Sequence, residues 1–155
     1  MDEHGRLAME LTTLLRGMKE LHTRVVEASD LPCELAGTFV LGRLAVLGPV
    51  RLTQLAQELG LDPSSVSRQV SSLERHGLVA KEKDAGDLRA QQLVLTPAGE
   101  AAVAALRAAR ARELARLLPD WAPAELDGLT ALLGRLNTDI ATHRDTPVVA
   151  RQETA

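Results

Sequence analysis

The residues that start and stop helices near the middle of this 155-residue chain constrain its fold more than any other feature. Thr53 is a favourable N-cap and Gly60 a favourable C-terminal stop, which predicts a short helix between them. Asp62 and Pro63 then supply an N-cap and a first helical position for a second helix, and Gly77 follows its end. The chain should therefore contain two short helices joined by a tight turn.

The spacing within this pair of helices indicates a helix-turn-helix. Ala56 is small enough for the second helix to cross closely, Gly60 suits the turn, and Val66 packs back on the first helix. Two strand-like runs follow at residues 78–83 and 91–95, with turn-forming residues between them. The sequence thus predicts one β-hairpin in an otherwise mainly α-helical chain, which is a winged helix-turn-helix.

Helices with apolar seams are expected at both ends of the chain. In the first helix the apolar residues recur at steps of four and three. They are Leu7, Leu11, Leu14, Met18, Leu21 and Val25, and Gly17 among them is consistent with a close helix approach. An Ala- and Arg-rich helix from Ala98 to about Leu118 and a last helix with Leu residues at similar spacing follow the hairpin. The two seams could bury each other within one chain or form a symmetric dimer, and the dimer is favoured.

These elements suggest one domain over residues 1–155. Residues 1–30 and 97–143 are expected to form dimerisation helices, and residues 31–95, which include a helix starting at Leu35, to form the winged helix-turn-helix lobe. The polar residues 144–155 are expected to form a flexible tail.

Composition excludes several classes of function. Aromatic residues make up 1% of the chain, which argues against platforms that stack bases or sugars, and a single cysteine rules out an intramolecular disulfide or a Cys-rich metal site. The four histidines are widely scattered, so neither a metal site nor any other cofactor is expected. No phosphate-binding glycine loop or nucleophile elbow is present, so the protein is not expected to be an enzyme. The absence of a long apolar run and of a secretion signal predicts a cytoplasmic protein without membrane contact.

The second helix of the pair presents a polar face opposite its apolar residues. That face consists of Ser64, Ser65, Ser67, Arg68, Ser71 and Arg75. Short hydroxyl side chains let a helix approach double-stranded DNA closely, and arginine bonds phosphate or guanine. The N-terminus of this helix would add amide donors for phosphate. The alternative is an ordinary solvated helix face rich in serine.

The hairpin also carries basic side chains, among them Lys81, Lys83 and Arg89. A basic hairpin beside a recognition helix is a wing, and its arginine could enter the minor groove. Asp87 is expected to orient a neighbouring arginine and so to stabilise the wing. The alternative is a surface hairpin with local ion pairs.

These motifs together resemble the MarR family of winged helix-turn-helix regulators. The matching stretches are residues 52–60, 64–79, 87–89 and 95–99, about a third of the chain. The resemblance implies a homodimer with interlocked terminal helices that binds a pseudo-palindromic operator, usually as a repressor, and is released by a small-molecule effector or an oxidant. Two residues depart from the family pattern, because Leu88 replaces a frequent basic residue in the wing and Gln69 a frequent apolar residue in the recognition helix.

Three basic residues are candidates for binding an effector. His22 and Arg43 fall on apolar stripes of their helices, where either could anchor the carboxylate or phenolate of an aromatic or other organic acid. Arg16 lies off the main stripe of the first helix and is a further candidate for binding an anion. The alternatives are a hydrogen-bonded histidine in the dimer seam and an ion-paired Arg43.

Two other functions remain open on the sequence alone. Cys33 follows Pro32 near a helix start and could sense oxidants if its pKa is lowered, although Glu34 opposes this and no second cysteine is present to form a disulfide within the chain. The net charge of −3, together with the equal numbers of acidic and basic residues in the segment 51–95, also allows a winged helix that binds a protein partner instead of DNA.

Overall fold

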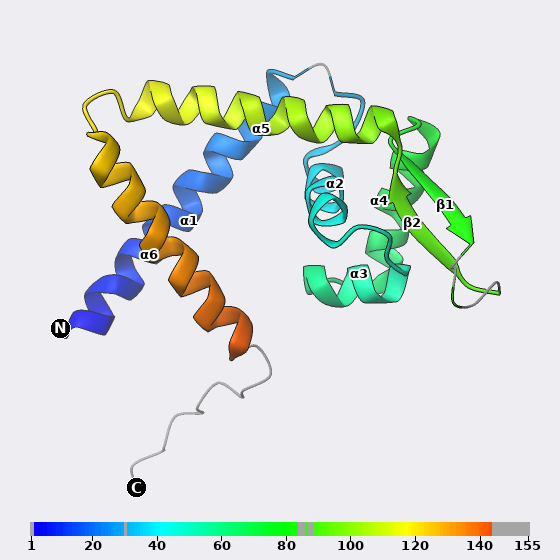
Figure 1. Cartoon of the computed structure of the whole chain (residues 1–155), viewed down its shortest axis with the longest axis horizontal. Coiled ribbons are helices and arrows are strands. Elements are labelled where there is room, and N and C mark those ends of the chain that lie inside the picture. Colours follow the sequence, from blue (N-terminus) through cyan, green and yellow to red (C-terminus); the bar gives the residue numbers. More distant parts are fainter. Residues whose placement is uncertain (1, 30, 84–85, 87–88, 144–155) are drawn as a thin grey trace, which may run out of the picture. The chain divides into compact units, whose positions relative to one another are not determined.

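The computed structural model describes residues 2–29, 31–83, 86 and 89–143 (Figure 1). The chain forms two compact units, Met1–Arg116 and Leu117–Ala155. The elements in chain order are α1 (Glu3–Glu27), α2 (Leu35–Leu47), α3 (Leu52–Leu59), α4 (Pro63–Arg75), β1 (Val79–Lys83), β2 (Gln91–Leu95), α5 (Pro97–Leu117) and α6 (Pro123–Thr142). None of the described helices is both long and apolar enough to span a bilayer. The mainly helical fold with one hairpin agrees with the sequence prediction.

The helix-turn-helix consists of α3 and α4, and its turn is formed as the sequence predicts. Gly60 adopts a left-handed conformation with φ of 65°, which glycine tolerates without a Cβ penalty. The Asp62 carboxylate caps α4 by accepting a hydrogen bond of 2.9 Å from the backbone N–H of Ser65. The predicted cap of α3 was wrong, because α3 begins at Leu52 with Arg51 as its N-cap residue and Thr53 lies inside the helix.

The wing is an antiparallel hairpin in which Val79 pairs with Leu95 and Lys83 with Gln91. A further pairing was not predicted from the sequence. Val50, between α2 and α3, exchanges backbone hydrogen bonds of 2.8 and 3.2 Å with Leu93. This bridge joins the start of the helix-turn-helix to the wing.

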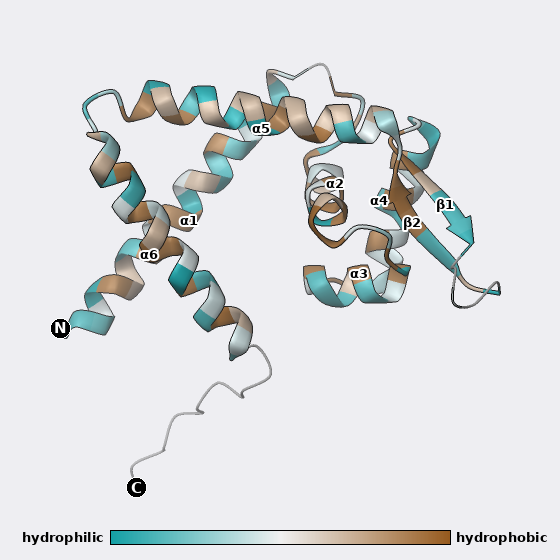
Figure 2. Ribbon diagram, viewed as in Figure 1, coloured by the Kyte–Doolittle hydropathy of each residue, from teal (hydrophilic) through white to brown (hydrophobic). Residues whose placement is uncertain are grey.

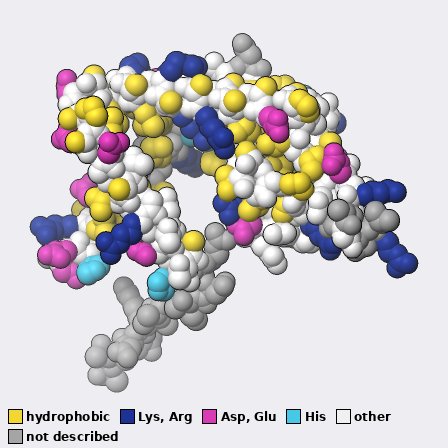
Figure 3. All heavy atoms as spheres, in the orientation of Figure 1, with side chains coloured by type: hydrophobic (Ala, Val, Ile, Leu, Met, Phe, Trp, Pro, Cys, Tyr) yellow, Lys and Arg dark blue, Asp and Glu magenta, His cyan; other side chains and the backbone are white. Residues whose placement is uncertain are grey.

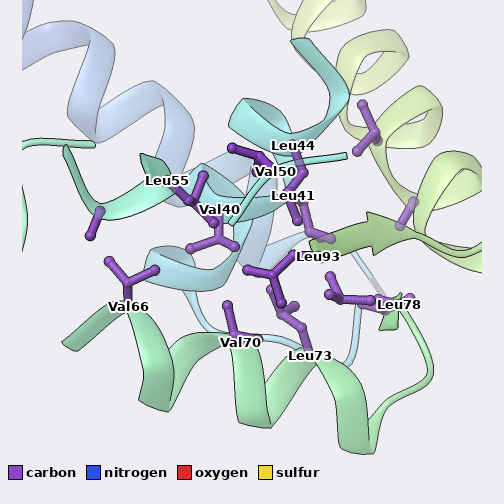
Figure 4. Packing of buried hydrophobic residues seen from close by; sticks show 14 residues of the cluster. Val40, Leu41, Leu44, Val50, Leu55, Val66, Val70, Leu73, Leu78 and Leu93 are labelled. Atoms are coloured by element: carbon purple, nitrogen blue, oxygen red, sulfur yellow. The ribbon is translucent and has the colours of Figure 1, made fainter. Parts of the chain in front are cut away.

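The main hydrophobic core lies between α2, α3, α4, the hairpin and the start of α5 (Figure 4). From α4, the side chains of Val66, Val70 and Leu73 point toward α2 and α3 and are at most 1% exposed. Because these three residues fix the rotation of α4, its opposite face must lie toward solvent.

A smaller cluster joins the C-terminal half of α1 to α5 through Leu21, Val25 and Leu106. The N-terminal half of α1 differs, since Leu7 is 50% exposed and Leu14 is 44% exposed. In the second unit, α6 has no buried residue, and Figure 2 shows hydrophobic residues recurring between hydrophilic ones along α1 and α6. The apolar seam of α1 is therefore buried within the chain over only part of its length.

Candidate nucleic-acid interface and ligand cavity

The solvent face of α4 carries the polar residues expected to contact DNA. Ser64, Arg68, Ser71 and Arg75 are exposed, while the flanking Ser65 and Ser67 are half-buried. The six predicted contact residues of α4 therefore lie on or beside one solvent-facing side of this helix. Two arginines separated by two turns and surrounded by short hydroxyl side chains form a surface that can approach a nucleic-acid groove closely.

The carboxylate of Asp62 already accepts hydrogen bonds from the first turn of α4. Asp62 accepts a hydrogen bond of 2.5 Å from the Ser64 hydroxyl as well as the one from the Ser65 N–H. These bonds hold the pKa of the Asp62 carboxyl far below its usual range, so it is ionised at neutral pH. The expectation that the N-terminus of α4 offers its amides to phosphate is therefore only partly met. Arg68, which donates to the Ser65 hydroxyl at 3.2 Å, places a cation beside this turn instead.

The basic residues of the wing differ in their surroundings. Lys83 and Arg89 are exposed, and Figure 3 shows basic side chains gathered at the end of the molecule that carries the hairpin. Lys81 is exposed as well, and it forms an ion pair of 2.7 Å with Glu74 of α4. Asp87 lies outside the described residues.

A groove of about 660 Å³ runs beside α4, between that helix and α2. Its apolar wall includes Phe39 and Leu61, which are 51% and 52% exposed, and its polar rim includes Arg68 and Arg75. Gln69 lines this groove, and its side-chain oxygen lies near Gly37 of α2. Its side chain therefore extends toward α2.

His22 lies at a junction of three helices. Its side chain is buried, with 7% exposure, and its Nε2 lies 2.8 Å from the Thr38 hydroxyl of α2. Arg110 Nη2 of α5 lies 2.9 Å from Nδ1, to which it donates, and 3.4 Å from Nε2. Burial, followed by the nearby Arg110 charge, lowers the pKa of His22, so the ring is neutral at neutral pH. The partners of this histidine come from within its own chain, whereas the sequence suggested a dimer seam.

The cavity beside His22 has a volume of about 740 Å³ and is predominantly apolar. It lies between α1, α2 and α5, with Leu59 of α3 at one edge. Among its lining residues, four are basic and none is acidic, and all of them belong to the described part of the chain. The basic ones are Lys19, Arg43, Arg107 and Arg110.

The two arginines nearest to His22 are held differently. Arg43 forms an ion pair with Glu58 of α3, and among the described residues no group accepts from its buried Nε. Arg110 is half-buried and its pKa is lowered, first by burial and then by the charge of Arg107. Its hydrogen-bond partner among the described residues is the neutral His22, with no carboxylate against it. Arg110 is therefore a partly desolvated cation without a neutralising anion.

Two of the three ligand candidates from the sequence line this cavity. His22 and Arg43 both line it, whereas Arg16 is exposed on α1 and does not. Arg107 and Arg110 were missed, because an Ala- and Arg-rich helix gives no strong indication of which arginines face inward. The sequence did offer one indication, which is that Arg107 and Arg110 lie within one turn of Leu106. The burial of Leu106 against α1 brings this part of α5 toward His22.

Cys33 is half-buried against the start of α2, near Gly37. Burial raises the pKa of its thiol, which disfavours the thiolate that reacts with oxidants. Within the described ranges, no group of three or more His, Cys, Asp or Glu side chains is arranged to hold a metal ion.

Comparison with known proteins agrees with this architecture. The family model described as MarR family matches residues 35–90, which span α2, the helix-turn-helix and the first strand of the wing. A transcriptional regulator of the helix-turn-helix type from Bacillus subtilis, YxaD, is 30% identical over 128 residues, which cover 83% of this chain and 88% of the relative.

Two solved structures are similar over nearly their whole length. A MarR family protein from Bacillus stearothermophilus superposes with a TM-score of 0.74 at 26% identity, covering 91% of this chain and 99% of that chain. RV1404 from Mycobacterium tuberculosis superposes with a TM-score of 0.75 at 25% identity, covering 97% and 99%. With the winged helix-turn-helix and its basic α4 face, these similarities show that the chain belongs to the MarR family, whose members are transcriptional regulators and not enzymes.

Proposed function

We propose that the protein represses transcription by binding a pseudo-palindromic DNA operator as a homodimer and that a small organic anion releases it. Each protomer places α4 in a major groove and the wing against the neighbouring backbone. The solvent face of α4 carries this proposal. It offers Arg68 and Arg75 with short serines around them, while the opposite face is locked into the core.

The contacts to DNA divide by residue type. Arg68 and Arg75 lie on the solvent face of α4, which would enter the DNA major groove. They are assigned to bases or to the phosphates at the edge of that DNA groove. The hydroxyls of Ser64, Ser65, Ser67 and Ser71 are assigned to phosphates and nearby base edges. Lys83 and Arg89 of the wing would contact the backbone or the minor groove.

Exposed apolar residues on the terminal helices support the homodimer. Leu7 and Leu14 of α1 and Ile140 of α6 are between 44% and 59% exposed in the single chain. A stripe of large apolar side chains along two long helices is costly to leave in water, and a second copy presents the same stripe. Residues 1–30 and 97–143 are proposed to form this interface.

The charge of the cavity supports an anionic effector. Lys19, Arg107 and Arg110 line an apolar space in which no acidic side chain of the described chain faces them. An organic acid would place its apolar body against Met18 and Val46 and its carboxylate beside Arg110, where the charge is partly desolvated.

Occupation of this cavity can influence DNA binding through α2. Phe39 and Leu59 line both the cavity and the groove beside α4. The Phe39 ring also contacts His22 edge-on, with the ring centres 4.8 Å apart. A ligand that displaces Phe39 would change the surface beside Arg68 and favour a form of the protein with lower affinity for DNA.

The DNA-binding proposal is tested by fluorescence anisotropy with a duplex from upstream of the protein's own gene and a scrambled duplex, at several salt concentrations. Selective binding that weakens steeply with salt is expected, because each phosphate contact releases counterions. Arg68→Ala should lower the affinity by about tenfold or more. Arg112→Ala is the matched control, because it also removes one exposed positive charge but lies on α5, outside α4 and the wing. This variant should bind the duplex with unchanged affinity.

Two results would contradict this assignment. Unchanged affinity in Arg68→Ala would remove Arg68 from the interface. Weak and equal binding of both duplexes, followed by failure to select any sequence from random DNA, would favour the alternative of a winged helix that binds a protein partner.

The effector proposal is tested with benzoate and its neutral analogue benzamide. Benzoate should bind and lower the affinity for the operator, whereas benzamide, which cannot neutralise Arg110, should bind more weakly. Arg110→Gln should abolish the preference for benzoate, while Arg112→Gln should retain it. If benzoate and benzamide bind equally, or neither binds, this cavity is not an anion site.

A further inference from the structure

We propose that binding of an organic anion in the cavity beside His22 is coupled to uptake of one proton by His22, so that the effector binds more tightly in mildly acidic solution. This inference rests on the anion site proposed above and concerns the regulation of that site. It makes the sensor respond to two signals, the anion and the pH.

Hydrogen bonding around His22 determines which ring nitrogen carries the proton. The Thr38 hydroxyl donates to the backbone carbonyl of Leu35 at 2.6 Å, so its oxygen must accept at its 2.8 Å contact with His22 Nε2. Nε2 therefore carries the hydrogen. Arg110 Nη2 lies 2.9 Å from Nδ1 and 3.4 Å from Nε2, and only Nδ1 keeps a lone pair to accept its hydrogen bond.

The charged groups around the ring oppose its protonation when the cavity is empty. Lys19 lies on α1 one turn before His22, and α5 contributes Arg107 and Arg110. From α2, Arg43 also faces the cavity, but Glu58 of α3 partly neutralises it. A proton on Nδ1 would also remove the acceptor that holds Arg110 and would place two cations in direct contact.

An anion in the cavity reverses this balance. A carboxylate beside Arg110 accepts the guanidinium hydrogen bonds that His22 Nδ1 accepts in the empty protein. Nδ1 is then able to bind a proton from solvent and donate it to the second carboxylate oxygen, while Nε2 continues to donate to Thr38.

The direction of the pH dependence follows from linkage. The pKa of His22 is lowered in the empty cavity and rises when an adjacent negative charge favours the imidazolium. Binding therefore takes up a proton at pH values between the empty-state and the bound-state pKa. Ligand affinity should rise by up to about tenfold per pH unit as pH falls through this window and should be flat above it.

Calorimetric titration of the intact protein with benzoate tests the inference. Measurements between pH 5.5 and 8.0 keep the ligand ionised, because a carboxylic acid has a pKa of about 4. Titrations at each pH in two buffers of different ionisation enthalpy yield the number of protons taken up. Uptake that approaches one proton per bound benzoate within the window is expected.

His22→Gln is the informative variant, because a glutamine amide can donate to Thr38 and accept from Arg110 but does not titrate. It should bind benzoate with pH-independent affinity and without proton uptake. His143→Gln, at an exposed histidine beyond the end of α6, should behave like the parent protein.

The outcomes separate the two proposals. Benzoate binding without proton uptake, or proton uptake that persists in His22→Gln, would overturn the coupling and leave the anion site standing. No binding of benzoate at any pH would overturn both. An NMR titration of the His22 imidazole provides a second readout, in which saturating benzoate should raise its pKa.

Discussion

The hydroxyl of Thr96 donates a hydrogen bond of 2.6 Å to the backbone carbonyl of Gly77, which links the residue before α5 to the residue that follows α4 and its cap. The same oxygen accepts from the backbone N–H of Gly99 at 3.0 Å and caps the first turn of α5. The Thr96 N–H completes the junction by donating to the Leu78 carbonyl at 3.1 Å. The helix that lines the cavity beside His22 and the helix proposed to bind DNA are thus joined through one threonine.

Replacing Thr96 by valine should lower the free energy of unfolding by about 1 to 2 kcal/mol, because the isosteric side chain can neither cap α5 nor bond Gly77. Urea denaturation measures this loss. Thr53→Val, at an exposed position inside α3, is the matched control and should change stability by less than about 0.5 kcal/mol. Equal effects of the two substitutions would show that the junction contributes little.

Gly99→Ala should be far more disruptive than a typical glycine substitution. A Cβ at this position would lie 2.0 Å from the Leu78 carbonyl oxygen, and that oxygen is held by the bond from Thr96. We expect a loss of at least about 3 kcal/mol or failure to fold, measured by thermal unfolding or by soluble yield. A stability close to that of the parent protein would mean that α5 can shift away from the wing.

Gly17→Ala tests whether α1 is closely approached by a second copy. Apart from its chain neighbours and the nearby backbone of α1, no atom of the described chain lies within 4 Å of the added Cβ, so the substitution should stabilise the helix by about 0.5 to 1 kcal/mol. Thermal unfolding and sedimentation would measure stability and oligomeric state together. A loss of stability with a weaker dimer would instead place a partner helix against this glycine, as the sequence pattern suggested.

The two wing lysines should differ in their importance for DNA. Lys83 is exposed, whereas the Lys81 charge is partly neutralised by Glu74 at 2.7 Å. Lys83→Ala should therefore lower operator affinity by about three- to tenfold and reduce the salt slope by about one, while Lys81→Ala should have the smaller effect. Fluorescence anisotropy at three salt concentrations distinguishes them. The reverse order would indicate that DNA displaces Glu74 from Lys81.

The stability of the folded protein should depend on the protonation of His22. Its pKa is lowered in the folded state from an ordinary value of 6.5, so the folded protein binds fewer protons than the unfolded chain below about that pH. The stabilisation is therefore complete above pH 6.5 and is lost as pH falls through the folded-state pKa. Urea denaturation from pH 8 to pH 5 should show this decline, and His22→Gln should flatten it. A decline of the same size in the variant would assign it to other groups.

The heptad pattern of α1 illustrates what the sequence could predict. It identified the helix and the apolar residues, and α1 does extend from Glu3 to Glu27. A periodic seam does not say what covers each part of it. Leu21 and Val25 are buried by α5 of the same chain, while Leu7 and Leu14 remain exposed. One seam thus has two different environments, because only its second half lies near the buried turn of α5.

Contacts between distant segments were harder to predict. The strand patterns indicated the hairpin, but a single bridge between Val50 and Leu93 leaves no periodicity in the sequence. The polar position of His22 was visible on the helical wheel, whereas its partner Arg110 lies 88 residues further along the chain. The exposed face of α4 was predictable in full because helix geometry alone places those residues together.

The position of Phe39 has a practical consequence for anyone who wishes to retune this protein as a biosensor. Its side chain lines both the cavity beside His22 and the groove beside α4, so enlarging it or trimming it would alter the proposed ligand site and the surface beside the proposed DNA-binding helix together. Arg107 and Arg110, by contrast, line the cavity but not the groove. If the cavity binds the proposed effector, a library that varies α5 and keeps Phe39 constant should change ligand choice without changing the proposed DNA-binding surface.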